Sequence, residues 1–596
     1  MYSGAFASIF IGDTYQDSLV VFEFLTLLSF SLLSIVIGKC IIKNYTKVAI
    51  FTIIVLLSTM QFENIGVINE LKSLFSAGNS ARLIRGMGLP LSAIFFLFCI
   101  KNWNLTKEKF PQLNDETKIA IILGSTAGLS ILWSNDYGFS NVGAIALLVA
   151  IQFFFNIYQK SFNYRKITIH YLKFTIIFTI SLLISFFIFG EILTYGNIHK
   201  WLSITIGIGQ YQNWYYNSGA NFYIYDLELS TSTVFQTLIT IYYIINYLKK
   251  GWSNTTVTRY VIPAYVNLTC IVAIQQYKLF SGGYNYQVAH AVLFLTVFYE
   301  LYNYIEQKLQ IKLSEKTLKR LKIIAMIAVL VLPSHKIYKE YREEHKTHEG
   351  ILVQELGGYL TNLGNDLISA KHILKNKKFF SEYASAQEVV NNSYQPSGID
   401  YIIHVLGDKQ REKYLTIFAN PSIEYAITIN KEFTPWAYWA ERANWFWFRE
   451  LYKNWHQVFK NDFEVIWKKS EKQNVIKGNF DIKVKKISHS AYELTIDLED
   501  KITGYADVLI DYKVSRRTKL SSLFVIKTVL KVQNLENLDV NNYYESNFIR
   551  PLGREYIPIK IVNGKGSILV TSLPERNTKL TIKEVNCSEI IIERKI

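Results

Sequence analysis

A succession of apolar stretches, each of spanning or near-spanning length, fills the first 335 residues of this sequence. They lie at about Ser18–Gly38, Val48–Met60, Gly86–Ile100, Lys118–Leu132, Ser140–Ile157, Ile167–Phe189, Ser232–Leu248, Tyr260–Tyr277, Gln287–Tyr304 and Leu321–Leu332. A helix needs roughly 20 residues to cross a hydrocarbon core about 30 Å thick, so the shorter stretches must borrow interfacial residues. We therefore predict a polytopic α-helical membrane bundle of about ten transmembrane helices over residues 1–335.

The composition agrees with a membrane bundle joined to a soluble part. Half of the 596 residues are hydrophobic, yet the chain carries 64 lysines and arginines. The net charge of +16 does not indicate nucleic acid, because much of the excess lies in short loops between the apolar stretches, where membrane orientation explains it. The four cysteines form neither a disulfide framework nor a metal-type spacing.

The lysines and arginines between the apolar stretches are concentrated in every second loop. The basic loops hold Lys39, Lys43, Lys47, Lys101, Lys107, Lys109, Lys118, Lys160, Arg165, Lys166, Lys249, Lys250, Arg259, Lys308, Lys312, Lys316, Lys319, Arg320 and Lys322. The opposite loops hold only Lys72, Arg82, Arg85, Lys200 and Lys278. The positive-inside rule predicts that the basic loops are cytoplasmic. Residues 1–17, 61–85, 134–139, 191–229, 278–286 and the region after Pro333 are then predicted to lie outside.

After Ser334 the hydropathy falls, and an extracytoplasmic α+β region is predicted. Residues 336–476 indicate a mainly helical, tryptophan-rich domain that holds six of the eleven tryptophans, Trp436, Trp439, Trp445, Trp447, Trp455 and Trp467. From about residue 477 the pattern has a period of two, for example in Tyr492–Leu498, and Asn563-Gly564 is typical of a hairpin turn. Residues 477–596 are therefore predicted to form a β-sandwich.

The short segment Trp133–Gly138 combines a carboxylate with two flanking apolar stretches. A charged Asp136 next to the hydrocarbon core of the membrane has a high free-energy cost unless it faces water, protein or a ligand. Tyr137-Gly138 allows the chain to reverse direction. One interpretation is a polar turn at the membrane surface, since Asn, Asp and Gly are good turn residues. The other is an active-site loop, and the loop charges place it outside, where substrate contacts are expected.

Several catalytic classes lack their motifs in this sequence. There is no Gly-x-Ser-x-Gly nucleophile elbow, no phosphate-binding loop and no Rossmann fingerprint. Neither His-x-x-x-His nor Cys-x-x-Cys occurs, so zinc has no support. Carboxylates and arginines on the outer loops remain as the chemically capable groups.

Carboxylates and arginines on an outer face suit sugar transfer from a lipid-phosphate donor. Such a transfer needs a carboxylate base for the acceptor hydroxyl, and cationic groups or a divalent ion such as Mg or Mn for the leaving phosphate. Asp13 and Asp17 are candidate bases. The alternative is that both are solvated carboxylates that help to keep the N-terminus outside. Arg82 and Arg85 are spaced to meet a phosphate on one helical face, but a lipid headgroup or a loop salt bridge explains them equally well.

About ten spans, acidic outer loops and an exported mixed domain together make residues 1–332 resemble the GT-C class of polyprenyl-phosphate-sugar glycosyltransferases. In that class the first outer loop carries a catalytic acidic residue, and Gly12–Ser18 is the segment here that corresponds to it. This segment precedes the first apolar stretch, which a helix upstream of residue 1 would explain. The resemblance implies hexosyl or pentosyl transfer from a lipid-linked donor to a cell-surface glycan or lipid, at the outer face of a bacterial inner membrane.

Further polar side chains outside the membrane are candidates for substrate contact. Glu63, Tyr137 and His199 lie on predicted outer loops, while Asp400 and His404 form a pair if their segment is helical. A histidine held by a carboxylate is also a common structural feature. The tryptophans suit stacking on sugar rings, but equally a packed core or a membrane interface.

Two other functions fit the same layout. A polysaccharide polymerase or ligase shares the topology and the substrates. A non-catalytic transport or assembly protein would bind glycan or lipid through its β-domain.

Overall fold

The computed structural model describes residues 15–61, 115–159, 164–250, 254–280, 286–308, 351–517, 523–535 and 546–592, with short gaps inside several of these ranges, and a few isolated positions at 88, 93 and between 316 and 327. The chain divides into two compact units. The helical unit comprises Met1–Ile198, Leu227–Lys278 and Gly283–Thr347, and the mixed unit comprises His199–Asp226, Leu279–Gly282 and His348–Ile596.

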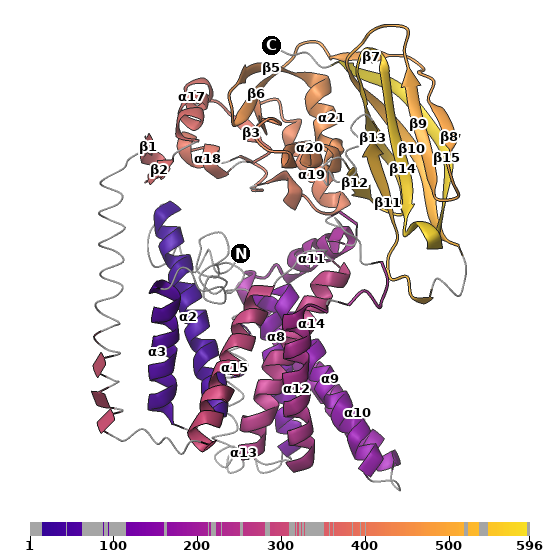
Figure 1. The fold of residues 1–596 in the computed structure, drawn as a ribbon. Coiled ribbons are helices and arrows are strands. Elements are labelled where there is room, and N and C mark those ends of the chain that lie inside the picture. Colours follow the sequence, from indigo (N-terminus) through magenta and orange to yellow (C-terminus); the bar gives the residue numbers. More distant parts are fainter. Residues whose placement is uncertain are drawn as a thin grey trace. The chain divides into compact units, whose positions relative to one another are not determined.

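The helical unit follows the predicted apolar stretches (Figure 1). Its described elements are α2 (Tyr15–Ile41), α3 (Tyr45–Gln61), α8 (Asp115–Trp133), α9 (Asn135–Gln159), α10 (Tyr164–Leu193), α12 (Thr231–Lys250), α13 (Asn254–Thr256), the π-helical turn η1 (Val257–Val261), α14 (Ile262–Phe280) and α15 (Tyr286–Lys308). Eight of the ten predicted stretches therefore fall on helices. The other two, Gly86–Ile100 and Leu321–Leu332, lie largely outside the described residues.

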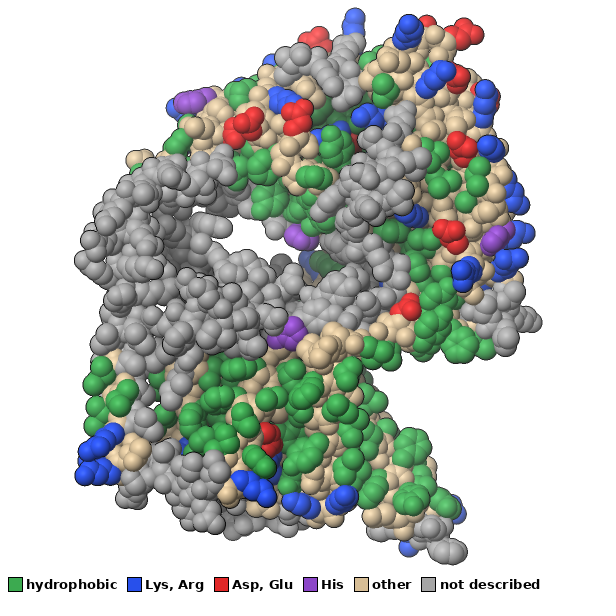
Figure 2. Space-filling view, viewed as in Figure 1, with side chains coloured by type: hydrophobic (Ala, Val, Ile, Leu, Met, Phe, Trp, Pro, Cys, Tyr) green, Lys and Arg blue, Asp and Glu red, His purple; other side chains and the backbone are tan. Residues whose placement is uncertain are grey.

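Four helical segments in the described part of the chain are long and apolar enough to cross a membrane. They are Tyr137–Gln159, Tyr164–Leu193, Val257–Gln276 and Val288–Lys308. Figure 2 shows hydrophobic side chains over much of the visible face of these helices, with lysines and arginines gathered at the end that carries α13. The helical N-terminal part is thus that of a multi-pass membrane protein, as predicted from the apolar stretches.

Polar side chains inside the helical unit pair with one another. Arg259 of η1 donates two hydrogen bonds to the carboxylate of Glu300 in α15, at 2.6 and 2.7 Å, and Tyr243 of α12 donates a third at 2.6 Å. The hydroxyl groups of Ser34 and Tyr299 lie 2.8 Å apart and join α2 to α15. Because unpaired polar groups are costly away from water, these contacts fix which helices are neighbours.

The tryptophan-rich part of the mixed unit contains a four-stranded sheet of order β3-β4-β6-β5. Its strands are β3 (Phe379–Ser381), β4 (Tyr425–Ile429), β6 (Glu464–Lys469) and β5 (Trp455–Lys460), and only the β3–β4 pair is parallel. The helices are α17 (Gly364–Leu374), α18 (Ser385–Asn391), α19 (Asp408–Phe418), α20 (Trp436–Ala443) and α21 (Trp445–Asn454). A short hairpin of β1 (Ile351–Val353) and β2 (Gly358–Leu360) precedes them.

Alternating side chains cover the two faces of this sheet. Phe379 and Ile427 pack with Leu374 of α17 on one face. Phe380 and Trp467 pack on the other face, in a cluster that includes α19 and α21. The period of two in each strand therefore places the sheet between two layers of helices.

Between Val475 and Ile592 the described residues form two antiparallel sheets (Figure 1). The buried side chains of the two sheets share one apolar core. One has the order β13-β10-β15-β7 and the other β12-β11-β14-β9-β8. The strands are β7 (Val475–Lys477), β8 (Lys483–Lys486), β9 (Ala491–Asp497), β10 (Gly504–Arg516), β11 (Val529–Asn534), β12 (Ser546–Ile549), β13 (Leu552–Ile561), β14 (Lys565–Leu573) and β15 (Thr578–Ile592). The C-terminal part is thus β-rich, as predicted. Asn563-Gly564 forms a tight turn with φ of 51° and 85°, but the strands on either side enter different sheets.

A buried aspartate ties α21 to the β-sandwich. Asp507 of β10 accepts hydrogen bonds from Lys453 Nζ and Trp445 Nε1, both at 2.9 Å, and from the guanidinium of Arg449. Burial opposes its ionisation, but the bonds from Arg449 and Lys453 hold the pKa of Asp507 below its usual value. The tryptophan-rich part and the sandwich are therefore joined by a charged contact that breaks only at high cost.

The segment between α10 and α12 contributes to the core of the mixed unit. It contains α11 (Ile198–Gln212), and its buried side chains Tyr211, Tyr215 and Phe222 pack in one cluster with Trp439 and Phe548. This unit therefore draws on residues 199–226 as well as on the predicted exported region after residue 336.

Candidate functional site

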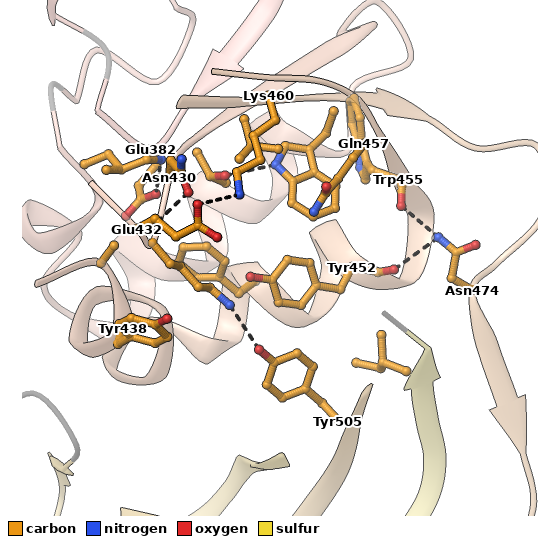
Figure 3. A pocket seen from close by; sticks show the side chains of 18 of the residues that line it. Glu382, Asn430, Glu432, Tyr438, Tyr452, Trp455, Gln457, Lys460, Asn474 and Tyr505 are labelled. Atoms are coloured by element: carbon orange, nitrogen blue, oxygen red, sulfur yellow. Dashed lines mark hydrogen bonds and ion pairs between the residues drawn. The ribbon is translucent and has the colours of Figure 1, made fainter. Parts of the chain in front are cut away.

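A cavity of about 320 Å³ lies in the mixed unit, between the four-stranded sheet, α20, α21 and the first sandwich sheet. Figure 3 shows how its polar and aromatic side chains face one another. Its polar lining comprises Glu382, Thr428, Asn430, Lys431, Glu432, Gln457, Lys460, Asn474 and Lys560. Its rings are Tyr438, Phe448, Tyr452, Trp455, Trp467 and Tyr505. A small number of placed polar groups among aromatic walls is the usual make-up of a small-molecule site.

Lys431 is held among tyrosine rings on one side of the cavity. Its Nζ donates a 3.0 Å hydrogen bond to the phenol oxygen of Tyr505 and forms an ion pair with Glu441. The ammonium also lies 5.6 Å from the ring centres of Tyr452 and Tyr505 and 5.9 Å from that of Tyr438. Burial alone would lower the pKa of Lys431, but the Glu441 carboxylate outweighs it and raises that pKa well above the ordinary value. Lys431 is therefore a fixed positive charge.

Glu382 supplies a neutral carboxyl group to the same cavity. It directly follows β3 and is 1% exposed, and its Oε2 accepts a 3.0 Å hydrogen bond from the backbone N–H of Ile429. Its Oε1 has no hydrogen-bond partner among the described residues. Burial, reinforced by the nearby Glu441, raises the pKa of Glu382 to about 8. At neutral pH this carboxyl is therefore protonated and has a hydrogen bond to offer.

The far end of the cavity carries further polar groups (Figure 3). Asn474 donates a 2.8 Å hydrogen bond to the carbonyl of Trp455, while its Oδ1 has no partner within the described part of the chain. Lys460 and Glu432 form an ion pair at 3.0 Å at the rim. Buried polar atoms without partners are rare in folded proteins, so Glu382 Oε1 and Asn474 Oδ1 are positions where a ligand would complete the hydrogen bonding.

The arrangement suits a sugar. Aromatic rings offer apolar faces for the C–H surface of a sugar ring, while amides, carboxyls and ammonium groups match its hydroxyl groups. For a metal, the described residues contain no group of three His, Cys, Asp or Glu side chains close enough to hold one. The predicted Mg or Mn ion therefore stays a prediction.

A second cavity, of about 520 Å³, lies within the helical unit. Ile145, Leu148 and Phe174 are among its apolar lining residues, and α8, α9, α10, α12, η1 and α14 all contribute to it. At one place Asn156 donates a 2.7 Å hydrogen bond to Tyr171. An apolar cavity between membrane helices fits a hydrocarbon chain such as an acyl or isoprenoid tail.

The predicted site residues have different placements. Asp13, Glu63, Arg82, Arg85 and Asp400 lie outside the described residues. Asp17 is in the first turn of α2 and Asp136 in the first turn of α9, and their side chains are not among those described.

The remaining three are described with their side chains. Tyr137 is 1% exposed and packs in the apolar core of the helical unit. His199 is exposed on α11, and His404 is exposed at the end of the short 3₁₀ turn Ile402–His404. The structure therefore gathers none of these three into the 320 Å³ cavity, and their predicted roles stay untested.

The chain reverses at Ser134, as Trp133–Gly138 led us to expect. Residues 135–138 form the first turn of α9, however, and are not an extended loop. A Cβ atom at Gly138 would lie 2.4 Å from Cα of Ile131, so only glycine permits this close approach of α9 to α8. Nearby, Tyr265 donates a 2.9 Å hydrogen bond to Asn141. The reversal is thus a packed polar hairpin at the helix ends.

Sequence reasoning missed most of this site. Trp455 and Trp467 were candidates for sugar stacking, and they line the cavity, but both are buried in an aromatic core as the alternative interpretation stated. Glu382 lies in the sequence Phe379-Phe-Ser-Glu and Lys431 in Asn430-Lys-Glu, which match no motif. The only available signal was a carboxylate directly after a short apolar strand.

Comparison with known proteins gives a weak likeness over the full length. No protein-family model matches the chain. No curated protein matches it either. Among solved structures, one of the Archaeoglobus fulgidus oligosaccharyltransferase, tethered with an acceptor peptide containing the NVT sequon, is similar with a TM-score of 0.35 and 11% identity. It covers 99% of this chain and 89% of that one.

A second structure is of the archaeal oligosaccharyltransferase AglB from the same organism, in complex with an inhibitory peptide and a dolichol-phosphate. Its TM-score is 0.32 and its identity 10%, with the same coverage. At such low TM-scores the likeness transfers no residue role and no substrate.

Proposed function

We propose that this protein is an integral membrane glycosyltransferase. It moves a sugar from a polyprenyl-phosphate-linked donor to a cell-surface glycan or lipid at the outer face of a bacterial inner membrane. The observation that carries the proposal is the 320 Å³ cavity, whose tyrosine and tryptophan rings stand beside a neutral carboxyl and a fixed ammonium group on a chain with membrane-spanning helices. We assign the cavity to the glycan acceptor.

The helical unit would bind the lipid part of the donor. Its 520 Å³ apolar cavity lies towards the helix ends that carry Lys118, Arg165 and Lys249, so it would take the distal part of an isoprenoid tail and not the donor phosphate. A chain with a sugar-type cavity in one unit and a hydrocarbon-type cavity in the other suits a reaction between a lipid-linked sugar and a glycan.

The proposed location of the reaction follows from chain topology. Residues 199–226 connect α10 to α12 and belong to the same compact unit as residues 348–596, so both lie in one compartment. The lysines at the end of α12, Lys249 and Lys250, mark the opposite, cytoplasmic end of that helix. On this basis the mixed unit is extracytoplasmic.

The proposed chemistry uses the acidic residues at the outer ends of the helices. A carboxylate, assigned to Asp13 or Asp17, accepts the proton of the acceptor hydroxyl while that oxygen bonds to the anomeric carbon. The bond from this carbon to the donor phosphate breaks, and its electrons leave with the phosphate. Arg82 and Arg85 balance the charge of the leaving phosphate, and Asp136 positions donor or acceptor.

Three substitutions test the catalytic assignment. Asp13→Asn, Asp17→Asn and Asp136→Asn remove a negative charge at nearly constant volume, whereas Glu471→Gln changes an exposed carboxylate of the mixed unit and is the control. We expect at least one of the three to abolish the glycan product while the protein accumulates normally in the membrane, and the control to be unaffected. Normal product from all three would instead favour a non-catalytic glycan-binding protein.

A separate experiment tests the acceptor cavity. Tyr438 faces the cavity and is 38% exposed, while Tyr383 has a similar exposure of 41% and does not line it. Tyr438→Ala is expected to weaken binding of cell-surface glycan fragments to the purified full-length protein about tenfold, and Tyr383→Ala to leave it unchanged. Equal affinities for both variants would remove the cavity from the account.

A further inference from the structure

Four large apolar side chains project together from the mixed unit. Ile224 is 53% exposed, Tyr225 60%, Leu523 71% and Phe524 52%. We call them the apolar tip. They come from two chain segments some 300 residues apart, and the rings of Tyr225 and Phe524 lie 6.1 Å apart. Single exposed apolar side chains are common on protein surfaces and need no explanation. A group of four large ones, in contrast, indicates a surface that binds a protein or a membrane.

The apolar tip is held on an ordered base. The two segments form an antiparallel bridge at Tyr223 and Val525, with hydrogen bonds of 2.8 Å from Ile224 N–H to the Phe524 carbonyl and from Ile526 N–H to the Phe222 carbonyl. Phe222 and Val525, on the inner side of this bridge, are 5% and 2% exposed. The backbone hydrogen bonds that hold Phe222 and Val525 in the core therefore also fix the exposed positions of the four tip residues.

The chain on either side of the apolar tip identifies its surroundings. Only four residues lie between Asp226 and Thr231, the first residue of α12, and each of the five steps along extended chain covers at most about 3.6 Å. Two of the residues between, Leu227 and Leu229, are also exposed and apolar. Asp226, which directly follows Tyr225 of the tip, is thus covalently held within about 18 Å of the start of α12, whose sequence was predicted to span the membrane.

In the proposed orientation, the start of α12 is the end that lies at the outer surface of the bilayer. The exposed apolar residues of this helix follow helical spacing on one face, namely Val234, Phe235, Leu238, Ile241, Tyr242 and Ile245. Such a face is that of a lipid-facing helix, and its basic end is at Lys249 and Lys250.

Three arginines lie at the base of the tip, together with the carboxylates of Asp226 and Glu575. Arg516 and Arg517, at the end of β10, and Arg576 are exposed. The N–H of Arg517 donates a 2.8 Å hydrogen bond to the carbonyl of Asn577, whose side chain accepts one from the Tyr223 phenol at 2.7 Å. At an anionic membrane surface the charged headgroups lie outside the apolar acyl chains. Arginines at the base of an apolar and aromatic tip match these two layers.

We propose that the apolar tip is a membrane anchor, which inserts Ile224, Tyr225, Leu523 and Phe524 into the outer leaflet of the bilayer while the arginines at its base contact anionic headgroups. This inference rests on the proposed orientation of the chain but not on the proposed reaction. Its effect is to hold the mixed unit at the membrane surface, where a lipid-linked substrate is presented.

The test uses the full-length protein in vesicles of phosphatidylcholine and phosphatidylglycerol. A fluorophore on Leu523→Cys reports on the tip, and one on Val562→Cys is the matched control. Val562 is 39% exposed and follows the strand residue Ile561, which pairs with Gly504 at the opposite end of β10. A strand of the length of β10 extends about 40 Å.

We expect lipids with a nitroxide near the headgroup to quench the Leu523 label at least about threefold more than the Val562 label. Replacing phosphatidylglycerol by phosphatidylcholine should reduce that difference. Equal quenching at the two positions would overturn the proposal. So would a Leu523 label that is shielded from aqueous iodide but unaffected by nitroxide lipids, because that result would place the tip against protein.

Discussion

The phenol of Tyr215 donates a 2.8 Å hydrogen bond to the side-chain oxygen of Asn444, a residue 229 positions away in the sequence. Asn444 is fully buried at the junction of α20 and α21, and its amide nitrogen donates to the carbonyl of Ala440 at 2.8 Å. Tyr215 also meets Trp439 edge-on, with ring centres 5.3 Å apart. The segment between α10 and α12 is therefore a structural part of the mixed unit.

The hydrogen bond from Tyr215 to Asn444 predicts that loss of the Tyr215 hydroxyl lowers the stability of the folded protein. Tyr215→Phe removes the donor and leaves a buried amide oxygen short of a partner, which costs about 1–3 kcal/mol. Thermal unfolding of the purified full-length protein in detergent should shift to lower temperature. Tyr225→Phe, at an exposed ring, is the control and should not shift it. An unchanged transition for Tyr215→Phe would mean that the segment contributes nothing to the stability of this unit.

The raised pKa of Glu382 predicts a stability that depends on pH. Its folded pKa of about 8 exceeds the value of 4.5 of an ordinary glutamate. Between these values the folded protein holds a proton that the unfolded chain releases, so stability falls as the pH rises through this window and the loss is complete above about pH 8. Glu464, whose pKa burial also raises to about 8, contributes in the same direction.

Glu382→Gln mimics the protonated carboxyl and should reduce this dependence. Relative to the wild type, the variant should unfold at a similar temperature near pH 5 and at a higher one near pH 9. Part of the slope should remain because of Glu464. Glu471→Gln, at an exposed carboxylate, should follow the wild-type curve. If Glu382→Gln is as pH-dependent as the wild type, Glu382 is not protonated in the folded protein at neutral pH.

A pair of glycine substitutions tests the packing at the α8–α9 reversal. A methyl group at Gly138 would overlap the backbone of Ile131, whereas nothing lies within 4 Å of the corresponding position at Gly209 in α11. Gly138→Ala should lower stability by about 1–3 kcal/mol through overpacking. Gly209→Ala should be neutral or stabilise by about 0.5–1 kcal/mol, because it reduces the freedom of the unfolded chain. A Gly138→Ala protein as stable as the wild type would contradict the close helix approach.

The membrane part of the fold was readable from the sequence because it depends on local patterns. Apolar stretches such as Ile167–Phe189 predict a helix by length alone, and α10 covers that stretch. The alternation in Tyr492–Leu498 likewise coincides with β9. Gly138 was recognised as a reversal point, although its reason, the backbone of Ile131, is visible only in three dimensions.

The cavity and the role of residues 199–226 were not readable because they depend on contacts between distant segments. Lys431 receives its properties from Glu441, Tyr452 and Tyr505, which no local pattern connects. Tyr215 resembles any aromatic residue of an outer loop until it meets Asn444. Asp13, Arg82 and Arg85 were identified from spacing and from resemblance, and they lie outside the described residues, so their roles rest on the mutational tests.

The proposed orientation predicts which positions an impermeant thiol reagent reaches. Glu499 is exposed in the connection between β9 and β10, and Lys249 is exposed at the end of α12. Glu499→Cys should react from the periplasmic side of intact cells, and Lys249→Cys only after lysis. Cys40, Cys270 and Cys587 are buried and Cys99 lies outside the described residues, so the blank is the same chain with Cys99 replaced by serine. Reaction of Glu499→Cys only after lysis would reverse the topology and remove the basis of the proposed function.

The central claim, sugar transfer from a lipid-linked donor, is tested most directly by measuring release of free polyprenyl phosphate. Purified protein in lipid nanodiscs is incubated with a panel of polyprenyl-phosphate-linked sugars and cell-surface glycan acceptors. We predict that at least one donor releases polyprenyl phosphate in step with transfer of its sugar, and that this activity is lost in the aspartate variant that abolishes product in cells. Binding of donor or acceptor without any release, over the whole panel, would contradict the enzymatic account and leave a glycan- or lipid-binding assembly protein.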